Sequence, residues 1–287
     1  MDNIKFSEVL KSYEEQNDEI DYKSKNKSEE ELSLIDNDVK RTPFIGLDPK
    51  EKVKKQFLVK ILKDLLISIP NFYYQGMSEI CSIFIFFYFS KEFDKFQNKE
   101  EESFTKKYSD EEYKKFRKFV KKKYDKVKNV LTNVISRKYE PLVKDNFKLY
   151  EHYNTVFLAM MKRRNIKIDE SYSFTYMNSV LTYFCRHVTS IDDSYKIFEI
   201  VLSCPPTAPF LLLIIYFDKI SKKKPITEVD IHLYESIILL EKEFLLVEEG
   251  LKKNKKCFLA RNAVVLGGLI GFVVAAAVYK YNKRADE

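Results

Sequence analysis

Apolar residues recur at three- and four-residue steps along most of the chain, and this spacing places them on one face of an α-helix. The clearest case runs from Glu51 to Ile69 and is ended by Pro70. Its apolar positions are Val53, Phe57, Leu58, Ile61, Leu62, Leu65 and Leu66. The next run, Ile80 to Phe89, is apolar on every face but too short to cross a bilayer. It predicts a helix in the centre of a globular core.

The segment from Lys91 to Lys128 is densely charged and predicts an insertion in the bundle. Its second half keeps a helical apolar spacing through Tyr113, Phe116, Val120, Tyr124, Val127 and Leu131, so we expect a surface helix there. Residues 100–110 are expected to form the loop before it. Further helices are predicted at Leu149 to Arg163, Ser173 to Val188, Ser194 to Leu202, Pro209 to Ile220 and Val229 to Leu246.

The composition favours an all-α fold, because 6 glycines and 8 prolines in 287 residues leave little material for a turn-dense β architecture. We expect one helical bundle over residues 30–250. Residues 1–29 are mostly charged and are expected to form a loosely ordered arm with room for one short helix. They lack the pattern of a secretory signal.

The C-terminal part has a different pattern. A basic segment, 251–262, precedes the uncharged stretch from Ala263 to Tyr279, and a short tail, 280–287, follows. Seventeen helical residues span roughly 25 Å, enough for a thin bilayer, so 263–279 is predicted to be a tail anchor. The basic flank places the large domain on the cytosolic side. Small residues every fourth position (Ala263, Gly267, Gly271, Ala275) predict weak helix–helix association in the membrane.

Charge and cysteine content exclude several function classes. The 50 basic residues are mixed with 43 acidic ones, without the basic stripe of a nucleic-acid-binding protein. Four scattered cysteines and 3 histidines favour neither a disulfide framework nor a zinc site. The cysteines are expected to be small buried hydrophobes in a reducing compartment. No nucleophile–base pair, metal cluster or phosphate-binding glycine loop indicates an enzyme with an active site of its own.

Two short motifs flank the first long helix. Ile35, Asp38 and Arg41 follow the pattern I-x-x-D-x-x-R, and Tyr73 and Gln75 follow Y-x-Q, with Gly76 next. In this order and spacing they resemble the signature motifs of the TBC domain, the catalytic domain of Rab GTPase-activating proteins. The likeness extends more loosely from about residue 30 to 220. With the tail anchor, the chain is most similar to the branch of that family anchored in the endoplasmic reticulum (ER).

The resemblance implies that Arg41 is an arginine finger and Gln75 a glutamine finger, both supplied in trans to a Rab GTPase. A guanidinium neutralises charge that develops on the transferred phosphoryl group, and a glutamine amide holds the attacking water. Asp38 is expected to hold Arg41, Gly76 to allow the turn that projects Gln75, and Tyr73 to pack beneath that loop. The protein needs no cofactor of its own, because GTP and Mg²⁺ belong to the Rab.

The chain departs from the family pattern in having no tryptophan. Ser179 or a neighbour stands where a helix tryptophan is common, and Glu199 replaces a usual aspartate. The alternative is therefore a membrane-tethered adaptor that binds a Rab without stimulating hydrolysis. A tail-anchored activator would act on a Rab of the early secretory pathway, between ER and Golgi.

Overall fold

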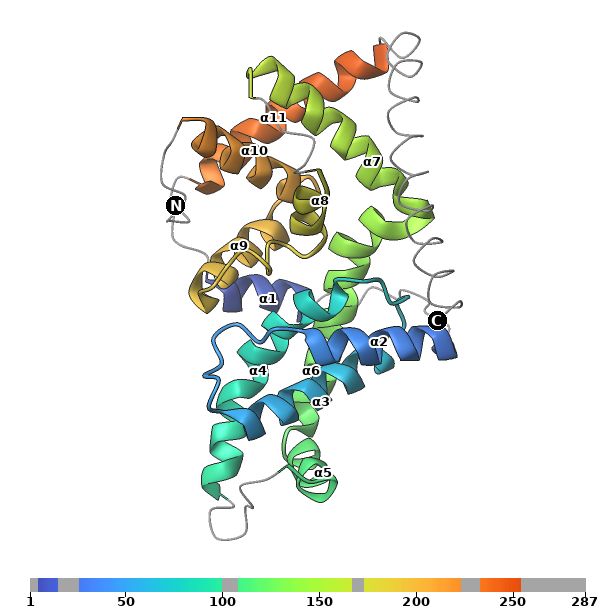
Figure 1. Cartoon of the computed structure of the whole chain (residues 1–287), viewed down its shortest axis with the longest axis vertical. Coiled ribbons are helices and arrows are strands. Elements are labelled where there is room, and N and C mark those ends of the chain that lie inside the picture. The colour runs from blue at the N-terminus through green and yellow to red at the C-terminus, as the bar shows by residue number, and fades with distance from the viewer. Residues whose placement is uncertain (1–4, 15–25, 100–107, 167–172, 223–232, 254–287) are drawn as a thin grey trace, which may run out of the picture.

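The computed structural model describes residues 5–14, 26–99, 108–166, 173–222 and 233–253, and all regular structure in these ranges is helical (Figure 1). The fold is therefore all-α, as predicted. The elements are α1 (Phe6–Glu14), α2 (Glu29–Arg41), α3 (Lys52–Ser68), α4 (Met77–Lys99), α5 (Asp110–Phe119), α6 (Lys121–Val134), the π-helix η1 (Ile135–Tyr139), α7 (Glu140–Arg163), α8 (Ser173–Leu181), α9 (Ile191–Ser203), α10 (Ala208–Ser221) and α11 (Leu233–Lys253).

Helix α4 lies in the core of one half of the bundle, with α3 packed along it and α6 and α9 on other sides. Its first three turns are buried on nearly every face, so the interpretation of Ile80 to Phe89 as a central core helix is confirmed. The helix predicted at Glu51 to Ile69 is α3. Phe57 of α3 meets Phe93 of α4 and Phe116 of α5 at ring-centroid distances of 5.0 and 5.5 Å. Aromatic rings thus fill the joint between three helices.

The N-terminal segment differs from the prediction, because α1 is part of the core. Its apolar residues Phe6, Val9, Leu10 and Tyr13 are all buried. The Tyr13 hydroxyl donates to the carbonyl of Leu202 at 2.9 Å, and Glu199 of α9 accepts a hydrogen bond from the backbone N–H of Phe6. The spacing of those four apolar residues is helical, but charged neighbours dilute it within one short stretch.

The described part of the charged segment is mostly helical. Its first residues continue α4 to Lys99, and the remainder forms two helices, α5 and α6, that meet at Val120. All six apolar residues that set the predicted spacing are buried while charged neighbours such as Lys114, Lys122 and Lys126 are exposed, so the predicted amphipathic surface helix is present, divided into two. The α5 helix begins after Ser109, whose side chain accepts a hydrogen bond from the N–H of Glu112 at 3.2 Å.

Two predicted helices have different bounds. The α7 helix is broken at residues 144–147, where Asp145, Asn146 and Phe147 have positive φ, so the predicted start at Leu149 corresponds to its second half. The α8 helix stops at Leu181 and not at Val188, because Tyr183 and Phe184 adopt left-handed φ values of 46° and 62°. The resulting turn directs the next residues toward α4. The predictions at 194–202, 209–220 and 229–246 correspond to α9, α10 and α11.

Cys81, Cys185 and Cys204 are buried free thiols, as expected of small hydrophobes, and Cys257 lies outside the described residues. Burial raises the pKa of the Cys204 thiol to about 11, so it remains protonated. Among the residues described, none of the helices has the length and apolarity needed to cross a membrane. The predicted anchor with Ala263, Gly267, Gly271 and Tyr279 lies outside the described residues.

Candidate functional site

The site is built where the end of α2 meets the loop before α4. Helix α2 starts with a capping box, in which Ser28 and Glu31 satisfy each other's backbone N–H groups, and it ends at Arg41. Arg41 is therefore the last helical residue and not part of a free loop. The next residue, Thr42, is buried, and its hydroxyl donates to the carbonyl of Asp38 at 2.8 Å. The end of the helix, and with it the Arg41 backbone, is fixed.

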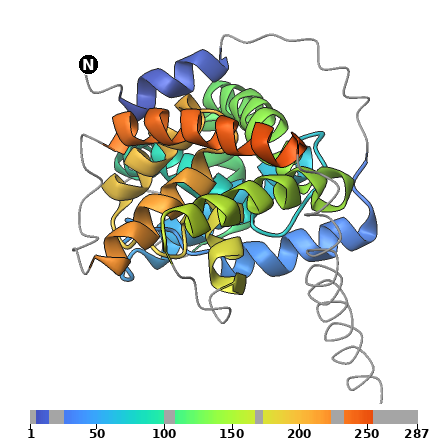
Figure 2. The same ribbon diagram turned by 90° about the horizontal axis from the view of Figure 1, so that it is seen from above.

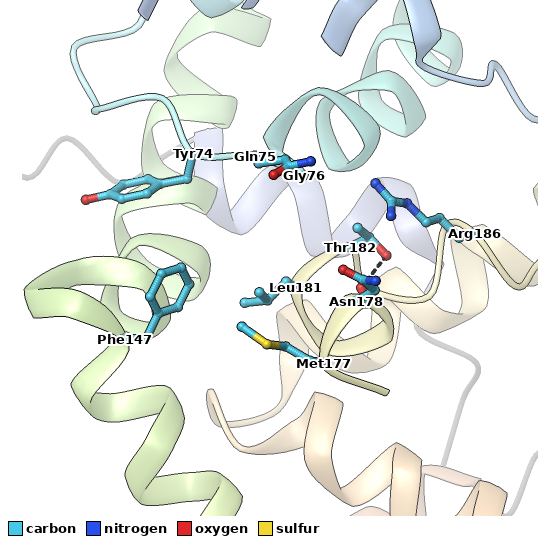
Figure 3. A pocket seen from close by; sticks show the side chains of 9 residues that line it. All are labelled: Tyr74, Gln75, Gly76, Phe147, Met177, Asn178, Leu181, Thr182 and Arg186. Atoms are coloured by element: carbon cyan, nitrogen blue, oxygen red, sulfur yellow. Dashed lines mark hydrogen bonds between the residues drawn. The ribbon is translucent and has the colours of Figure 1, made fainter. Parts of the chain in front are cut away.

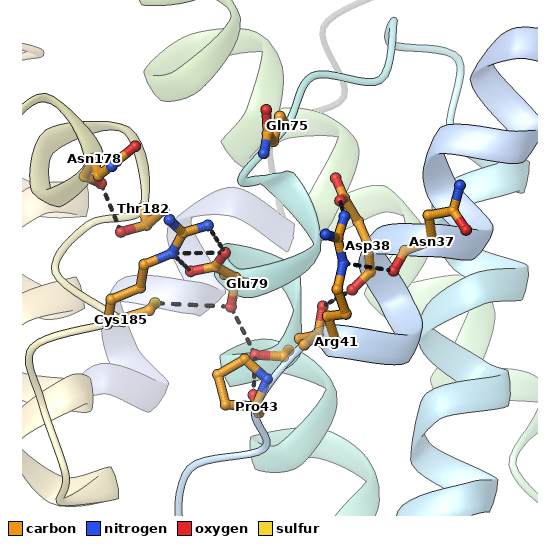
Figure 4. A network of polar contacts seen from close by, with 12 residues as sticks. Asn37, Asp38, Arg41, Pro43, Gln75, Glu79, Asn178, Thr182 and Cys185 are labelled. Carbon is orange, nitrogen blue, oxygen red and sulfur yellow. Dashed lines mark hydrogen bonds and ion pairs between the residues drawn. The ribbon is translucent and has the colours of Figure 1, made fainter. Parts of the chain in front are cut away.

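Asp38 binds both Arg41 and Tyr73; Figure 4 shows its contact with Arg41. Its Oδ1 accepts a hydrogen bond from Arg41 Nη2 and its Oδ2 one from the Tyr73 hydroxyl, each at 2.9 Å. Arg41 Nε also donates to the carbonyl of Asn37 at 3.2 Å. The expected Asp38–Arg41 hydrogen bond is thus present. The Arg41 side chain is still 72% exposed, whereas that of Asp38 is 8% exposed.

The loop that carries Tyr73 is tied to α2 by a second carboxylate. Glu31 Oε1 accepts a hydrogen bond from the backbone N–H of Tyr73 at 3.1 Å. Burial would raise the pKa of Glu31, but hydrogen bonds from the N–H groups of Tyr73 and Ser28, together with Lys27, outweigh it, and the pKa falls below its ordinary value. Burial also raises the pKa of the Tyr73 phenol far above its ordinary value, so it acts as a donor to Asp38.

Gln75 is exposed, and its side-chain amide makes no hydrogen bond to any residue that the structure describes. Its backbone, in contrast, is held: the hydroxyl of Tyr139, in the π-helical turn η1, donates to the Gln75 carbonyl at 2.8 Å. Gly76 follows with a φ of 100°, a conformation that favours glycine. A Cβ there would lie 3.1 Å from the carbonyl oxygen of Leu181. The loop thus presents a free amide on a fixed backbone.

A cavity of about 190 Å³ opens beside this loop (Figure 3). One side is largely apolar and the other polar, and Gln75 lies at its edge. The lining residues are Tyr74, Gln75, Gly76, Phe147, Met177, Asn178, Leu181, Thr182 and Arg186. The break in α7 brings Phe147 to this wall, and the turn after α8 contributes Arg186. Segments far apart in the sequence therefore meet next to Gln75.

Arg186 is the functional candidate that the sequence analysis missed. Its Nε lies 3.0 and 2.8 Å from the two carboxylate oxygens of Glu79, and its Nη2 also contacts Oε1. These hydrogen bonds raise the pKa of Arg186, although burial opposes the shift. The Glu79 carbonyl accepts from Ser82 Oγ at 2.7 Å and from Cys185 Sγ at 3.7 Å. The ion pair joins the first turn of α4, just after Gln75, to the turn after α8.

No signal in the sequence could have identified this pair. Glu79 and Arg186 are 107 residues apart, and neither follows a motif whose chemistry predicts the other.

Among the remaining predicted residues, Ile35 is fully buried and acts through packing. Ser179, which with its neighbours was compared with a family tryptophan position, is buried, and its Oγ lies 2.8 Å from His187 Nε2. In the part of the chain that the structure describes, no group of three or more potential ligands could hold a metal ion.

The model of the Rab-GTPase-TBC domain (RabGAP-TBC) matches residues 4–225. The chain belongs to this family. The match includes α1, in agreement with the burial of that helix, and it covers Arg41, Gln75 and Arg186.

The chain is also 36% identical, over 310 aligned residues, to an uncharacterized membrane protein of Encephalitozoon cuniculi (strain GB-M1). This alignment covers 99% of the present chain and 100% of the relative. The search of solved structures gives no match. Membership of the TBC family implies a Rab GTPase as partner and GTPase activation as the typical activity, without a cofactor of the TBC protein's own.

Proposed function

We propose that this TBC domain accelerates GTP hydrolysis by a Rab GTPase through Arg41 and Gln75. The observation that carries the proposal is that both side chains are exposed while their backbones are fixed, and that Asp38 and Tyr73 link the two segments by hydrogen bonds. An interaction made only with the charge of the transition state raises the rate without needing tight ground-state binding. Exposed, pre-positioned polar groups suit that role.

Arg41 would act on the phosphoryl oxygens of the bound GTP. Its guanidinium is planar and permanently charged, so it can neutralise the charge that develops on the transferred group. In the free protein Nη2 and Nε are occupied by Asp38 and the Asn37 carbonyl, and Nη1 has no hydrogen-bond partner among the described residues. This arrangement holds the side chain near the surface of the site and leaves the Nη1 group of the guanidinium for the partner.

Gln75 would orient the attacking water. An amide side chain both donates and accepts hydrogen bonds, so it can hold a water molecule in line with the phosphorus atom. The exposed amide and the restrained backbone of Gln75 support this role. GTP and Mg²⁺ would arrive with the Rab.

The stretch 263–279 is proposed to anchor the protein in the ER membrane, with the TBC domain on the cytosolic side, where it would act on a Rab of the early secretory pathway. The membrane-protein name of the Encephalitozoon relative supports the membrane part of this proposal. Deleting residues 263–287 should release the protein from the membrane fraction. Truncated protein that still sediments with membranes would contradict the anchor.

The proposal is tested by single-turnover GTP hydrolysis with a panel of purified Rab proteins. Stimulation of at least one early-secretory Rab, abolished by Arg41→Ala, is the expected result. Binding of a Rab without any stimulation would favour the adaptor. Preference for an endosomal Rab would overturn the assignment to ER–Golgi traffic but not the proposed GTPase activation.

A further inference from the structure

Helix α11 has an unusual outer face. Its inner face (Ile237, Leu240, Phe244 and Val247) is buried against α7 and α10. Its outer face carries four exposed apolar residues: Ile238 (37% exposed), Leu239 (66%), Leu245 (49%) and Leu246 (67%). Figure 2 shows α11 on the outside of the bundle, lying across one end of the molecule. Exposed apolar side chains gathered on one helix face in this way mark interaction surfaces.

Charged residues of both signs share and border this apolar face. Lys242 lies within it together with the exposed Glu235 and Glu249, and Arg163 and Arg164 at the end of α7 reach its edge. Arg164 forms an ion pair with Glu243, and Nη2 of Arg163 comes within 3.9 Å of the position that a Cβ on Gly250 would occupy. Gly250 and Leu246 are one helical turn apart, so the guanidinium groups lie beside the leucines. Exposed apolar side chains interspersed with charged groups suit the boundary between lipid headgroups and acyl chains.

The position of α11 in the chain indicates that a membrane covers this face. Only residues 254–262 separate its end from the predicted anchor at Ala263, and that length reaches at most roughly 30 Å when fully extended. The connecting sequence holds Lys255, Lys256 and Arg261, which favour an anionic membrane surface.

A second copy of the chain fits this face less well. The four apolar side chains together expose on the order of 400 Å², about half of the ~800 Å² per partner that a standard stable interface buries. Contact with a membrane surface does not require this minimum buried area, because the anchor already holds the helix close to the lipid.

We propose that the outer face of α11 lies on the membrane surface and fixes the orientation of the TBC domain relative to the bilayer. This inference rests on the anchor in the proposed function. The four apolar residues enter the headgroup region, and Lys242 and Arg163 meet lipid phosphates. The anchor and α11 together would then hold the TBC domain in one orientation toward a membrane-bound Rab.

The test uses the full chain with Cys257→Ser, so that the three buried cysteines are the only native thiols left. Leu246→Cys carries an environment-sensitive fluorophore, and Phe119→Cys, at the end of α5 and 41% exposed, is the matched control at the opposite end of the molecule. The labelled proteins are incorporated into phosphatidylcholine–phosphatidylserine vesicles, and quenching by spin-labelled lipids is measured after flotation.

The expected result is strong quenching and a blue shift at position 246, with little quenching at 119. Protein that floats with the vesicles but shows equal, weak quenching at both positions overturns the inference and leaves the anchor intact. A blue shift that depends on protein density and is insensitive to lipid quenchers assigns the face to a second copy and also overturns it. Protein that fails to float overturns the anchor itself, and the orientation with it. Circular dichroism confirms that each variant is folded.

Discussion

The Tyr73 hydroxyl donates a hydrogen bond to Oδ2 of Asp38 at 2.9 Å, and this contact joins two motifs that are 35 residues apart in the chain. The other oxygen of Asp38 holds Arg41. The loop that carries Gln75 and the helix that carries Arg41 therefore share one buried carboxylate. Any change that frees this carboxylate is expected to loosen both side chains together.

Tyr73→Phe removes that shared hydrogen bond. We expect a loss of about 1–3 kcal/mol in the free energy of unfolding, because the buried Asp38 oxygen loses its donor, together with a lower rate of stimulated GTP hydrolysis. Tyr88→Phe is the matched control, since the Tyr88 hydroxyl also donates to a carboxylate, that of Glu14 at 3.0 Å, away from the site. The control should lower stability but leave the hydrolysis rate per folded molecule unchanged. Equal rates for both variants would disprove the link.

Gly76→Ala tests the left-handed turn before α4. The substitution places a Cβ 3.1 Å from the Leu181 carbonyl at a φ of 100°, so we expect about 1–3 kcal/mol of destabilisation and reduced GTPase activation. Gly250→Ala in α11 is the control, because its Cβ would meet only Arg163 Nη2 at 3.9 Å. That change should stabilise the protein by up to about 1 kcal/mol. Urea denaturation measures the free energy of unfolding of both variants. A Gly76→Ala variant with unchanged stability and unchanged GTPase activation would show that the turn is not required.

Arg186 is expected to act as a positioning residue for Gln75. Arg186→Ala leaves the buried Glu79 carboxylate without its cation, so the first turn of α4 should shift and the maximal rate of stimulated hydrolysis should fall by roughly 10- to 10²-fold. The concentration of Rab needed for half-maximal rate should change little. Arg164→Ala, which removes an exposed ion pair with Glu243, is the control.

Partial recovery of the rate by Arg186→Lys would agree with the positioning role, because an ammonium can still pair with Glu79 but not in bidentate fashion. A change confined to stability, with a normal rate per folded molecule, would reduce Arg186 to a structural residue.

Glu31 is expected to make the stability of the α2–loop contact depend on pH. Its pKa in the folded chain lies below the ordinary 4.5, so as the pH falls the unfolded chain takes up the proton first. The stabilisation is present above about pH 4.5 and is lost as the pH falls toward the lower folded value. Glu31→Gln should therefore flatten the fall in the urea midpoint between about pH 5 and pH 3. Glu30→Gln controls for the loss of one charge, and an unchanged slope for Glu31→Gln would contradict the prediction.

The sequence predicts the elements whose own residues carry a long periodic signal. Helices α3 and α4 follow from apolar spacing over several turns, and the I-x-x-D-x-x-R and Y-x-Q motifs indicate the family. The core role of α1 was missed, because four apolar residues among charges also fit a solvated arm. The early end of α8 and the break in α7 depend on tertiary contacts. The Glu79–Arg186 pair could not be predicted for the same reason, since only folding brings its two members together.

The most direct test of the account is single-turnover GTP hydrolysis by the cognate Rab with wild type, Arg41→Ala, Arg41→Lys, Gln75→Ala and the double alanine variant. Lys40→Ala, which removes a neighbouring exposed cation, is the matched control. We expect Arg41→Ala to lose about 10² to 10⁴ in rate, or roughly 3–5 kcal/mol of barrier, with Rab binding retained.

Arg41→Lys should recover little, since an ammonium lacks the donor fork, and Gln75→Ala should also be slow. The double variant should lose less than the sum of the single losses, because both groups act on one transition state. Lys40→Ala should match wild type. Unchanged rates for Arg41→Ala and Gln75→Ala in folded, Rab-binding protein would contradict the account and identify the domain as an adaptor.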